Sequence, residues 1–152
     1  MQRRTVLSAL ALLGVMPALS VAKAGQPVIN VYKSATCGCC TEWISHLEKN
    51  GFKVNAHNVP NTAAYRTQFG VPPALGSCHT GVIDGYALEG HVPAADIKRL
   101  LAEKPKGKGL AVPGMPVGSP GMEVEGVAAD AFDVLLFQAD GKTRVYRHYA
   151  GK

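Results

Sequence analysis

The feature that most constrains this chain is a group of three cysteines at the junction between a predicted strand and a predicted helix. Residues 27–33 (PVINVYK) alternate in side-chain direction and predict a buried strand, and the turn 34–40 (SATCGCC) follows directly. The residues at positions i, i+3, i+4 and i+7 of the next segment are Cys40, Trp43, Ile44 and Leu47. This spacing predicts a helix with one face in a core, so the cysteine turn is expected at a helix N-terminus.

The order of the remaining elements predicts the fold class. The next expected elements are a strand at 52–59, a short helix capped by Asn61, an extended loop from Val71, a hairpin around Asp84-Gly85 and a helix from Pro93. Residues 107–126 are rich in Gly and Pro and predict a long loop, and residues 132–149 predict a second hairpin. We therefore expect an α/β, thioredoxin-like fold with a mixed sheet, flanking helices, and an added C-terminal Gly/Pro/Met loop and β-hairpin.

The N-terminus has the three-part layout of a secretory signal peptide. Arg3 and Arg4 precede an apolar run at 6–15, and Ala22-Lys23-Ala24 is a small-residue cleavage signal. We expect cleavage after Ala24, a periplasmic location, and a single metal-binding domain at 25–152. The paired arginines also resemble a twin-arginine export signal, so the export route stays open between the general secretory and the twin-arginine systems.

The charge of the chain belongs largely to this leader. The net charge of +5 falls to +2 once its three basic residues are removed. No basic run with interleaved aromatic residues follows, which argues against a nucleic-acid partner. No later apolar run is long enough to cross a bilayer, so stable membrane insertion is not expected.

The spacing of the cysteines is compatible with two kinds of chemistry, metal binding and disulfide exchange. Cys37 and Cys40 lie three residues apart at a helix start, where free N–H groups and the helix dipole favour thiolates, which bind soft metals and attack disulfides. A dithiol redox site has no use for the third sulfur of Cys39. Three thiolates this close together favour a metal site that bridges more than one ion.

Four residues farther along the chain extend the expected metal site. In a thioredoxin-like fold the proline loop before the third strand faces the cysteine turn, which would bring Cys78 opposite the first three sulfurs and His79 beside it. Met115 and Met122 sit in two Pro-Gly-Met units of the long loop. Thioether sulfur prefers Cu(I), so these methionines favour copper over zinc, calcium or magnesium.

Three alternatives remain open from the residues alone. The cysteines could form two structural disulfides, or Cys37 and Cys40 could act as a periplasmic thiol–disulfide oxidoreductase. A zinc ion on Cys37, Cys40, Cys78 and His79 would make a Cys3His site but would leave Cys39 unused. The other histidines are His46, expected near a solvated helix face, and His57, His91 and His148, for which structural or solvent roles are expected.

The strings CGCC (37–40), SCHTGVIDGYALEGHVPAADIKRLL and GLAVPGMPVGSPGMEV together resemble the CopG-type copper-resistance proteins of bacteria. The resemblance runs from about Val31 to Val124. It implies a thioredoxin-like fold, a periplasmic setting and a cysteine-bridged copper cluster, with redox conversion between Cu(I) and Cu(II) as one possible role. It also implies that Cys37, Cys39, Cys40 and Cys78 are the thiolate ligands.

The resemblance and the residues together indicate which partners to expect. Copper ions are the expected ligand, and periplasmic copper export or chaperone proteins are the expected protein partners. His79, Met115 and Met122 are additional candidate ligands. Whether the protein turns over a substrate stays open at this point.

Overall fold

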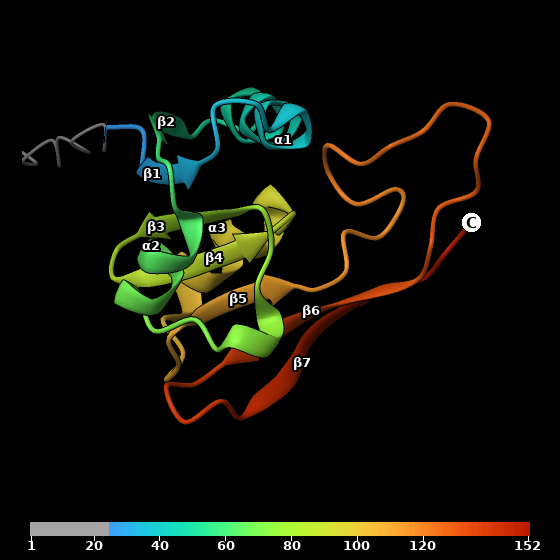
Figure 1. Ribbon diagram of the computed structural model, residues 1–152. Helices are drawn as coiled ribbons and strands as arrows, with labels where there is room; N and C mark the ends of the chain where they lie inside the picture. Colours follow the sequence, from blue (N-terminus) through green and yellow to red (C-terminus); the bar gives the residue numbers. More distant parts are fainter. Residues whose placement is uncertain (1–24) are drawn as a thin grey trace, which may run out of the picture.

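The protein is built on one seven-stranded mixed sheet with the order β2-β1-β3-β4-β5-β6-β7 (Figure 1). The computed structural model describes residues 25–152, so the predicted signal peptide at 1–24 lies outside the described residues. The strands are β1 (Val28–Lys33), β2 (Lys53–Asn58), β3 (His79–Ile83), β4 (Tyr86–Gly90), β5 (Gly109–Val112), β6 (Phe132–Phe137) and β7 (Thr143–Tyr149). The helices are α1 (Gly38–Lys49), α2 (Thr62–Gln68) and α3 (Ala94–Glu103), and a 3-10 turn covers Pro73–Leu75.

Local sequence signals explain most of these elements. In α1 the predicted stripe is confirmed, because Cys40, Trp43 and Leu47 are fully buried. The side chain of Asn61 accepts a hydrogen bond from the backbone N–H of Ala64 and so caps α2, as predicted. The hairpin between β3 and β4 turns through two residues with positive φ, as the Asp84-Gly85 pair predicts.

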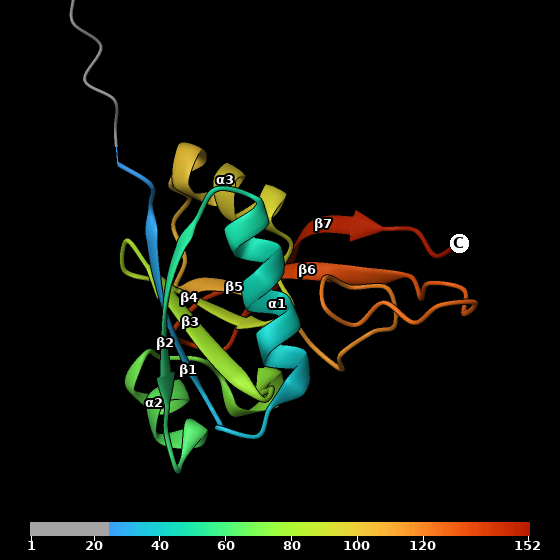
Figure 2. The same cartoon turned by 90° about the horizontal axis from the view of Figure 1, so that it is seen from above.

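The sheet has two covered faces. Helices α1 and α3 are neighbours over one face (Figures 1 and 2), where Trp43, Ile97 and Leu100 pack in the larger core. The other face carries a smaller core around Val71, Leu75 and Phe137, next to α2 and the 3-10 turn. The pairs β1–β2 and β4–β5 are parallel and are connected through α1 and α3, while the other pairs are antiparallel. The α/β class with a mixed sheet is confirmed, and the arrangement is compatible with a thioredoxin-like core.

The prediction of an unbroken loop at 107–126 was wrong at its start. Residues Gly109–Val112 form β5, which is fully buried and lies inside the sheet between β4 and β6. A strand that is buried on both faces shows no polar alternation, and this one has only four residues between Gly- and Pro-rich segments. Periodicity therefore could not reveal it.

The C-terminal hairpin, β6 and β7, is anchored to α3. The hydroxyl of Tyr149 donates to the buried carboxylate of Asp96 (2.6 Å), and the hydroxyl of Tyr146 donates to Glu103 (2.9 Å).

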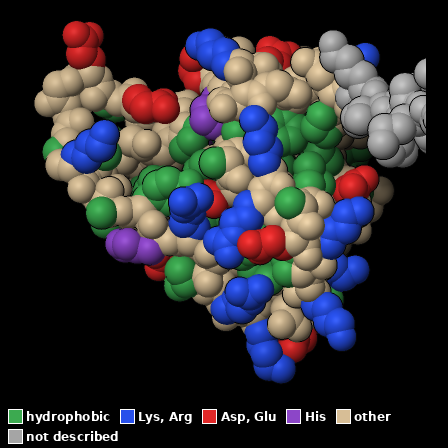
Figure 3. Space-filling view, turned by 180° about the vertical axis from the view of Figure 1, so that it is seen from behind, with side chains coloured by type: hydrophobic (Ala, Val, Ile, Leu, Met, Phe, Trp, Pro, Cys, Tyr) green, Lys and Arg blue, Asp and Glu red, His purple; other side chains and the backbone are tan. Residues whose placement is uncertain are grey.

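The surface has a mixed character. On the face opposite that of Figure 1, Lys and Arg side chains lie among apolar and acidic ones (Figure 3). Within residues 25–152, no helix has the length and apolar character needed to cross a bilayer.

Candidate metal centre

The sheet register brings the cysteine turn and Cys78 to the same place. Strands β1 and β3 are antiparallel neighbours, with Lys33 at the end of β1 opposite His79 at the start of β3. The turn that follows β1 therefore meets the residue that precedes β3. That turn carries Cys37 as the N-cap of α1 and Cys39 in its first turn, and the residue before β3 is Cys78.

The four sulfur atoms form one cluster. The Sγ atom of Cys78 lies 3.7 Å from that of Cys39 and 3.6 Å from that of Cys40, and the Sγ atoms of Cys37 and Cys39 are 3.6 Å apart. All four lie within 4.8 Å of one another. Cys40 is buried and the other three are half-buried, so the cluster is partly open to solvent.

Two of these sulfurs are joined. A disulfide connects Cys37 and Cys40, whereas Cys39 and Cys78 are free thiols. The alternative of two structural disulfides therefore does not describe this structure. A site that uses all four sulfurs as thiolates requires that this one bond be reduced.

Burial controls the protonation of Cys78. Loss of solvent contact, together with the hydrogen bond with Cys39, raises the pKa of its thiol to about 12. Cys78 is therefore a neutral thiol near pH 7 when no metal is bound. Because a metal binds the thiolate, metal binding at Cys78 must release a proton.

His79 lies directly beside the cluster, where the sequence placed it. Its Nδ1 atom is 3.5 Å from the Sγ of Cys78, and its Nε2 atom is 2.9 Å from the carbonyl oxygen of Gly90. Burial lowers the pKa of His79 to about 3, so the ring is neutral. Its ring stacks on that of Trp43, with the centroids 4.3 Å apart.

His91 is a site residue that the sequence prediction missed. One of its ring nitrogens lies within 4.8 Å of ligand atoms of Cys78 and His79, and its side chain is fully buried. The structural or solvent role expected for it is therefore incomplete. The predicted hairpin could have indicated this position, because the register of β3 and β4 places the residues just after β4 beside the start of β3.

His46 also differs from its expected solvent-facing position. Its Nε2 atom accepts a hydrogen bond from the backbone N–H of Ala94 (3.1 Å), the first residue of α3. Burial lowers the pKa of this imidazole, which favours the neutral form that can accept. The two helices lie together on one face of the sheet, and the side chain of His46 connects α1 to the N-terminus of α3 by this hydrogen bond.

A buried carboxylate holds the segment that carries Cys78. Glu89 of β4 is fully buried, and one of its oxygens accepts from the backbone N–H of Ser77 (2.6 Å) and from the Ser77 hydroxyl (2.8 Å). The other oxygen accepts from the hydroxyl of Thr80 (2.7 Å). Arg66 supplies the opposite charge at 3.2 Å. Residues on both sides of Cys78 are thus fixed by one group.

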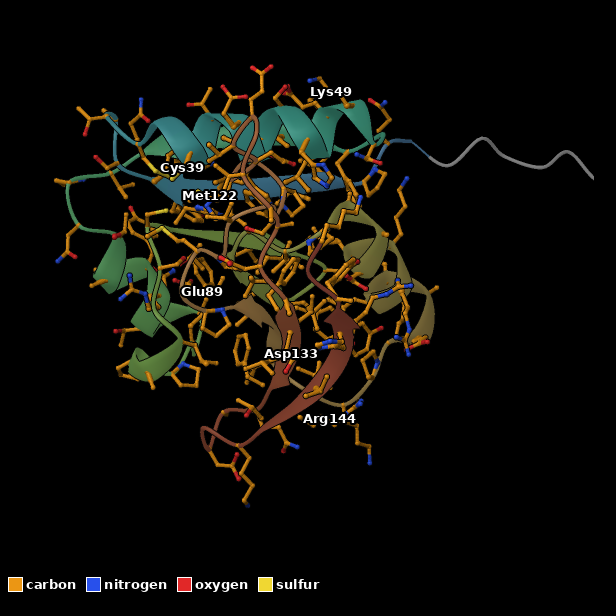
Figure 4. The ribbon with its side chains drawn as sticks, turned by 90° about the vertical axis from the view of Figure 1, so that its right-hand side faces the viewer. Cys39, Lys49, Glu89, Met122, Asp133 and Arg144 are labelled. Atoms are coloured by element: carbon orange, nitrogen blue, oxygen red, sulfur yellow. A yellow bond between two sulfur atoms is a disulfide. The ribbon has the colours of Figure 1, made fainter. Side chains whose placement is uncertain are left out.

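The Gly/Pro/Met loop crosses the first turns of α1. Gly121 lies so close to the helix that a Cβ atom there would be 2.7 Å from the backbone nitrogen of Trp43. Met122 is half-buried next to this contact, and Figure 4 shows it beneath the helix on the side of Cys39. Met115 is 42% exposed. Of the two predicted methionines, the structure thus holds the segment of Met122 against α1 and leaves Met115 at the surface.

This chain is similar to known proteins in sequence and in structure. The family model described as "Protein of unknown function, DUF411" matches residues 75–122, a segment that contains Cys78, both histidines of the site and both loop methionines. No curated protein matches the chain.

Two solved structures match the chain over most of its length. They are "Copper resistance protein copG", form 2 and form 1, each with 51% identity and a TM-score of 0.77. Form 2 is matched over 82% of this chain and 98% of its own, and form 1 over 83% and 100%. Identity at this level, over nearly the full length of the relative, shows that this chain belongs to the CopG-type family of copper-resistance proteins.

Proposed function

We propose that this protein is an exported copper-handling protein of the periplasm that binds Cu(I) through Cys37, Cys39, Cys40 and Cys78. One observation carries the proposal: the Sγ atom of Cys78 is within 3.7 Å of those of Cys39 and Cys40. Four cysteine sulfurs this close are suited to soft metals once the disulfide is reduced, and thiolates are the preferred ligands of Cu(I). The printed names of the two structural relatives, copper resistance proteins, favour copper among these metals.

The disulfide sets a condition for binding. A reductant must supply two electrons to convert the Cys37–Cys40 bond into two thiolates before all four sulfurs are available. The half-buried Cys78 thiol must in addition lose its proton to the solvent as the metal binds. Loading of the four-sulfur site is therefore expected only under thiol-reducing conditions.

The arrangement favours more than one copper ion. Cys39 and Cys40 are adjacent at the start of α1, so their side chains leave the helix in different directions. Cys78 lies close to both sulfurs. Such a sulfur is placed to bridge ions, and we expect a cluster with Cys78 at its centre, with His79 and Met122 as additional ligands and Met115 supplied by movement of the loop.

The test is a Cu(I) titration of the reduced protein against a competing chelator, compared with Cys78→Ser. We expect more than one Cu(I) per wild-type chain and a lower number and affinity in the variant. Ser34→Ala, which removes a hydroxyl group near the motif, is the control. Equal stoichiometry and affinity in wild type and Cys78→Ser would refute the shared site, and tighter binding of Zn(II) than of Cu(I) would favour the zinc alternative.

A second function is supported by the disulfide itself. Cys37 is half-buried and Cys40 is fully buried, the arrangement of an attacking and a resolving thiol in an oxidoreductase. In the reduced protein the Cys37 thiolate would attack a substrate disulfide. Cys40 would then displace the mixed disulfide, which leaves the Cys37–Cys40 bond and a reduced substrate.

Turnover of a disulfide substrate with a thiol reductant tests this second function. Activity that is lost in Cys37→Ser and kept in Cys39→Ser would support it, and no activity in the wild type would refute it.

The export proposal has its own test. Cleavage after Ala24 predicts a mature protein that begins at Gly25, and mass spectrometry of the exported protein would measure this.

A further inference from the structure

A second group of metal-ligating side chains shares Cys78 with the four-sulfur cluster and contains neither cysteine of the disulfide. It consists of Cys78, His79 and His91, whose ligand atoms are within 4.8 Å of one another. Both histidines are fully buried. None of the three residues belongs to the Cys37–Cys40 disulfide, so this group exists while that bond is closed.

The hydrogen bonds of His79 leave one nitrogen free to bind a metal. A carbonyl oxygen can only accept a hydrogen bond, so Nε2, 2.9 Å from the Gly90 carbonyl, carries the proton. In the neutral ring Nδ1 then has a free lone pair. This atom is the one that faces the sulfur of Cys78 at 3.5 Å.

The same reasoning applies to His91. Its Nδ1 atom is 2.8 Å from the carbonyl oxygen of Pro120 and must be the donor. Its Nε2 atom therefore has the free lone pair, and this buried atom has no hydrogen-bond partner among the described residues. Buried nitrogens are nearly always satisfied, so an unpartnered nitrogen on a ring that lies beside a thiol and a second imidazole points to a ligand.

Both rings also have the support that metal-binding histidines usually have. A histidine that binds a metal typically donates its other ring N–H to a carboxylate or a backbone carbonyl, which fixes the tautomer and the ring orientation. Gly90 and Pro120 provide these carbonyls. Ligands at about 2.0–2.3 Å from an ion are up to about 4.6 Å apart, so the three atoms need only a small approach.

We propose that Cys78, His79 and His91 form a second metal site, of mixed sulfur and nitrogen ligands, which binds one copper ion when the Cys37–Cys40 disulfide is closed. One thiolate and two imidazoles are the ligand set of protein sites that hold copper in both oxidation states. The inference rests on the proposed function and extends it, because the two sites share Cys78 and the neighbouring His79. Opening the disulfide would thus add sulfur ligands next to an ion that is already bound.

The binding test uses the oxidised full chain, with the disulfide confirmed by mass spectrometry after alkylation. Co(II) serves as the probe because it accepts the same ligands without oxidising thiols, and its thiolate charge-transfer absorption reports a bound sulfur. We expect one Co(II) per chain with this absorption. His91→Gln keeps an N–H that can donate to Pro120 but removes the imidazole, and it should weaken binding at least about tenfold.

His148→Gln is the matched control, because His148 is exposed and pairs with Asp133 on the C-terminal hairpin. Circular dichroism checks that both variants fold. X-ray absorption of Co(II) bound to the wild-type chain gives an independent readout, which should show two nitrogen neighbours of imidazole type and at least one sulfur. Unchanged binding in His91→Gln, sulfur neighbours alone, or no binding to the oxidised wild type would each overturn the second site.

A parallel Cu(I) titration of the reduced protein separates this inference from the proposed function. Loss of Co(II) binding to the oxidised chain with normal Cu(I) loading of the reduced chain would reject the second site alone. Failure of Cu(I) loading with normal Co(II) binding would reject the four-sulfur site alone.

Discussion

The sulfur of Cys78 lies 3.6 Å from that of Cys40, although 38 residues separate them in the chain. The contact follows from the antiparallel pairing of β1 and β3, which places the residue before β3 against the first turn of α1. Cys78 also lies within reach of His79 and His91. It is thus the one residue common to both groups of metal-ligating side chains, and the following predictions test what holds it there and what surrounds it.

Replacing Glu89 by Gln should weaken copper binding without removing a ligand. The carboxylate accepts two hydrogen bonds from Ser77 and one from Thr80, and it pairs with Arg66. Loss of its charge should lower the free energy of unfolding by about 1.5–3 kcal/mol, the range for hydrogen bonds to charged groups. Urea denaturation and Cu(I) competition measure the two effects.

The control for Glu89→Gln is Asp140→Asn. Asp140 forms an exposed ion pair with Lys142, and such pairs contribute about 1 kcal/mol or less. A Glu89→Gln protein with unchanged Cu(I) affinity would show that the Ser77–Cys78 segment is held by other contacts.

The affinity for Cu(I) should rise with pH. Burial raises the pKa of Cys78 to about 12, so this thiol stays protonated from pH 6 to pH 9 and must release a proton to bind. Each proton released in this way makes the affinity increase about tenfold per pH unit. The slope of log affinity against pH, measured with a chelator of known pH dependence, should be smaller in Cys78→Ser, and an equal slope would contradict this role for Cys78.

Met122→Ala should lower the Cu(I) affinity more than Met115→Ala does. Met122 is half-buried on the segment held against α1, whereas Met115 is 42% exposed. We expect at least about a tenfold loss for Met122→Ala, a change comparable to the loss of a supporting group at a metal site. Chelator competition on the two variants side by side makes the comparison, and equal losses would show that Met115 contributes as much to the site as Met122 does.

Gly121→Ala should loosen the loop from α1. Gly121 has φ +84°, and a Cβ atom there would lie 2.7 Å from the Trp43 nitrogen. Gly126 of the same loop has φ +76° but nothing within 4 Å of its Cβ position, so Gly126→Ala is a matched control with the same backbone strain. Overpacking should make Gly121→Ala less stable than this control by about 1–3 kcal/mol, as measured by thermal or urea unfolding. Equal stabilities would place the loop off the helix in solution.

Much of the fold could be predicted because the signals are local. The stripe of Cys40, Trp43 and Leu47 repeats with the period of a helix, and Asn61 is a helix cap. The Asp84-Gly85 pair favours the positive φ values that a two-residue hairpin needs. Strand β5 could not be found this way, because a short strand with both faces buried shows no alternation, and the Gly and Pro residues on both sides of it are typical of a loop.

The candidate site was predictable in part for the same reason. Cys37, Cys39 and Cys40 are neighbours in sequence, so their closeness needs no tertiary information. His46 and His91 were misjudged, since a helix position or a spacing along the chain does not say which other element covers a side chain. The partners of these two residues, Ala94 and Pro120, come from α3 and from the long loop.

The sequence by itself determined the α/β order of elements, the helix that presents three cysteines at its start, and the membership in a copper-resistance family. Only the tertiary structure decided that Cys78 meets those cysteines, that Cys37 and Cys40 are joined, and that the ring of His91, with one unpartnered nitrogen, lies in the same region. The physical reason is that helix and turn formation depend on interactions between residues close in the chain. The meeting of distant side chains depends on strand register and on the packing of whole elements, which no single segment encodes.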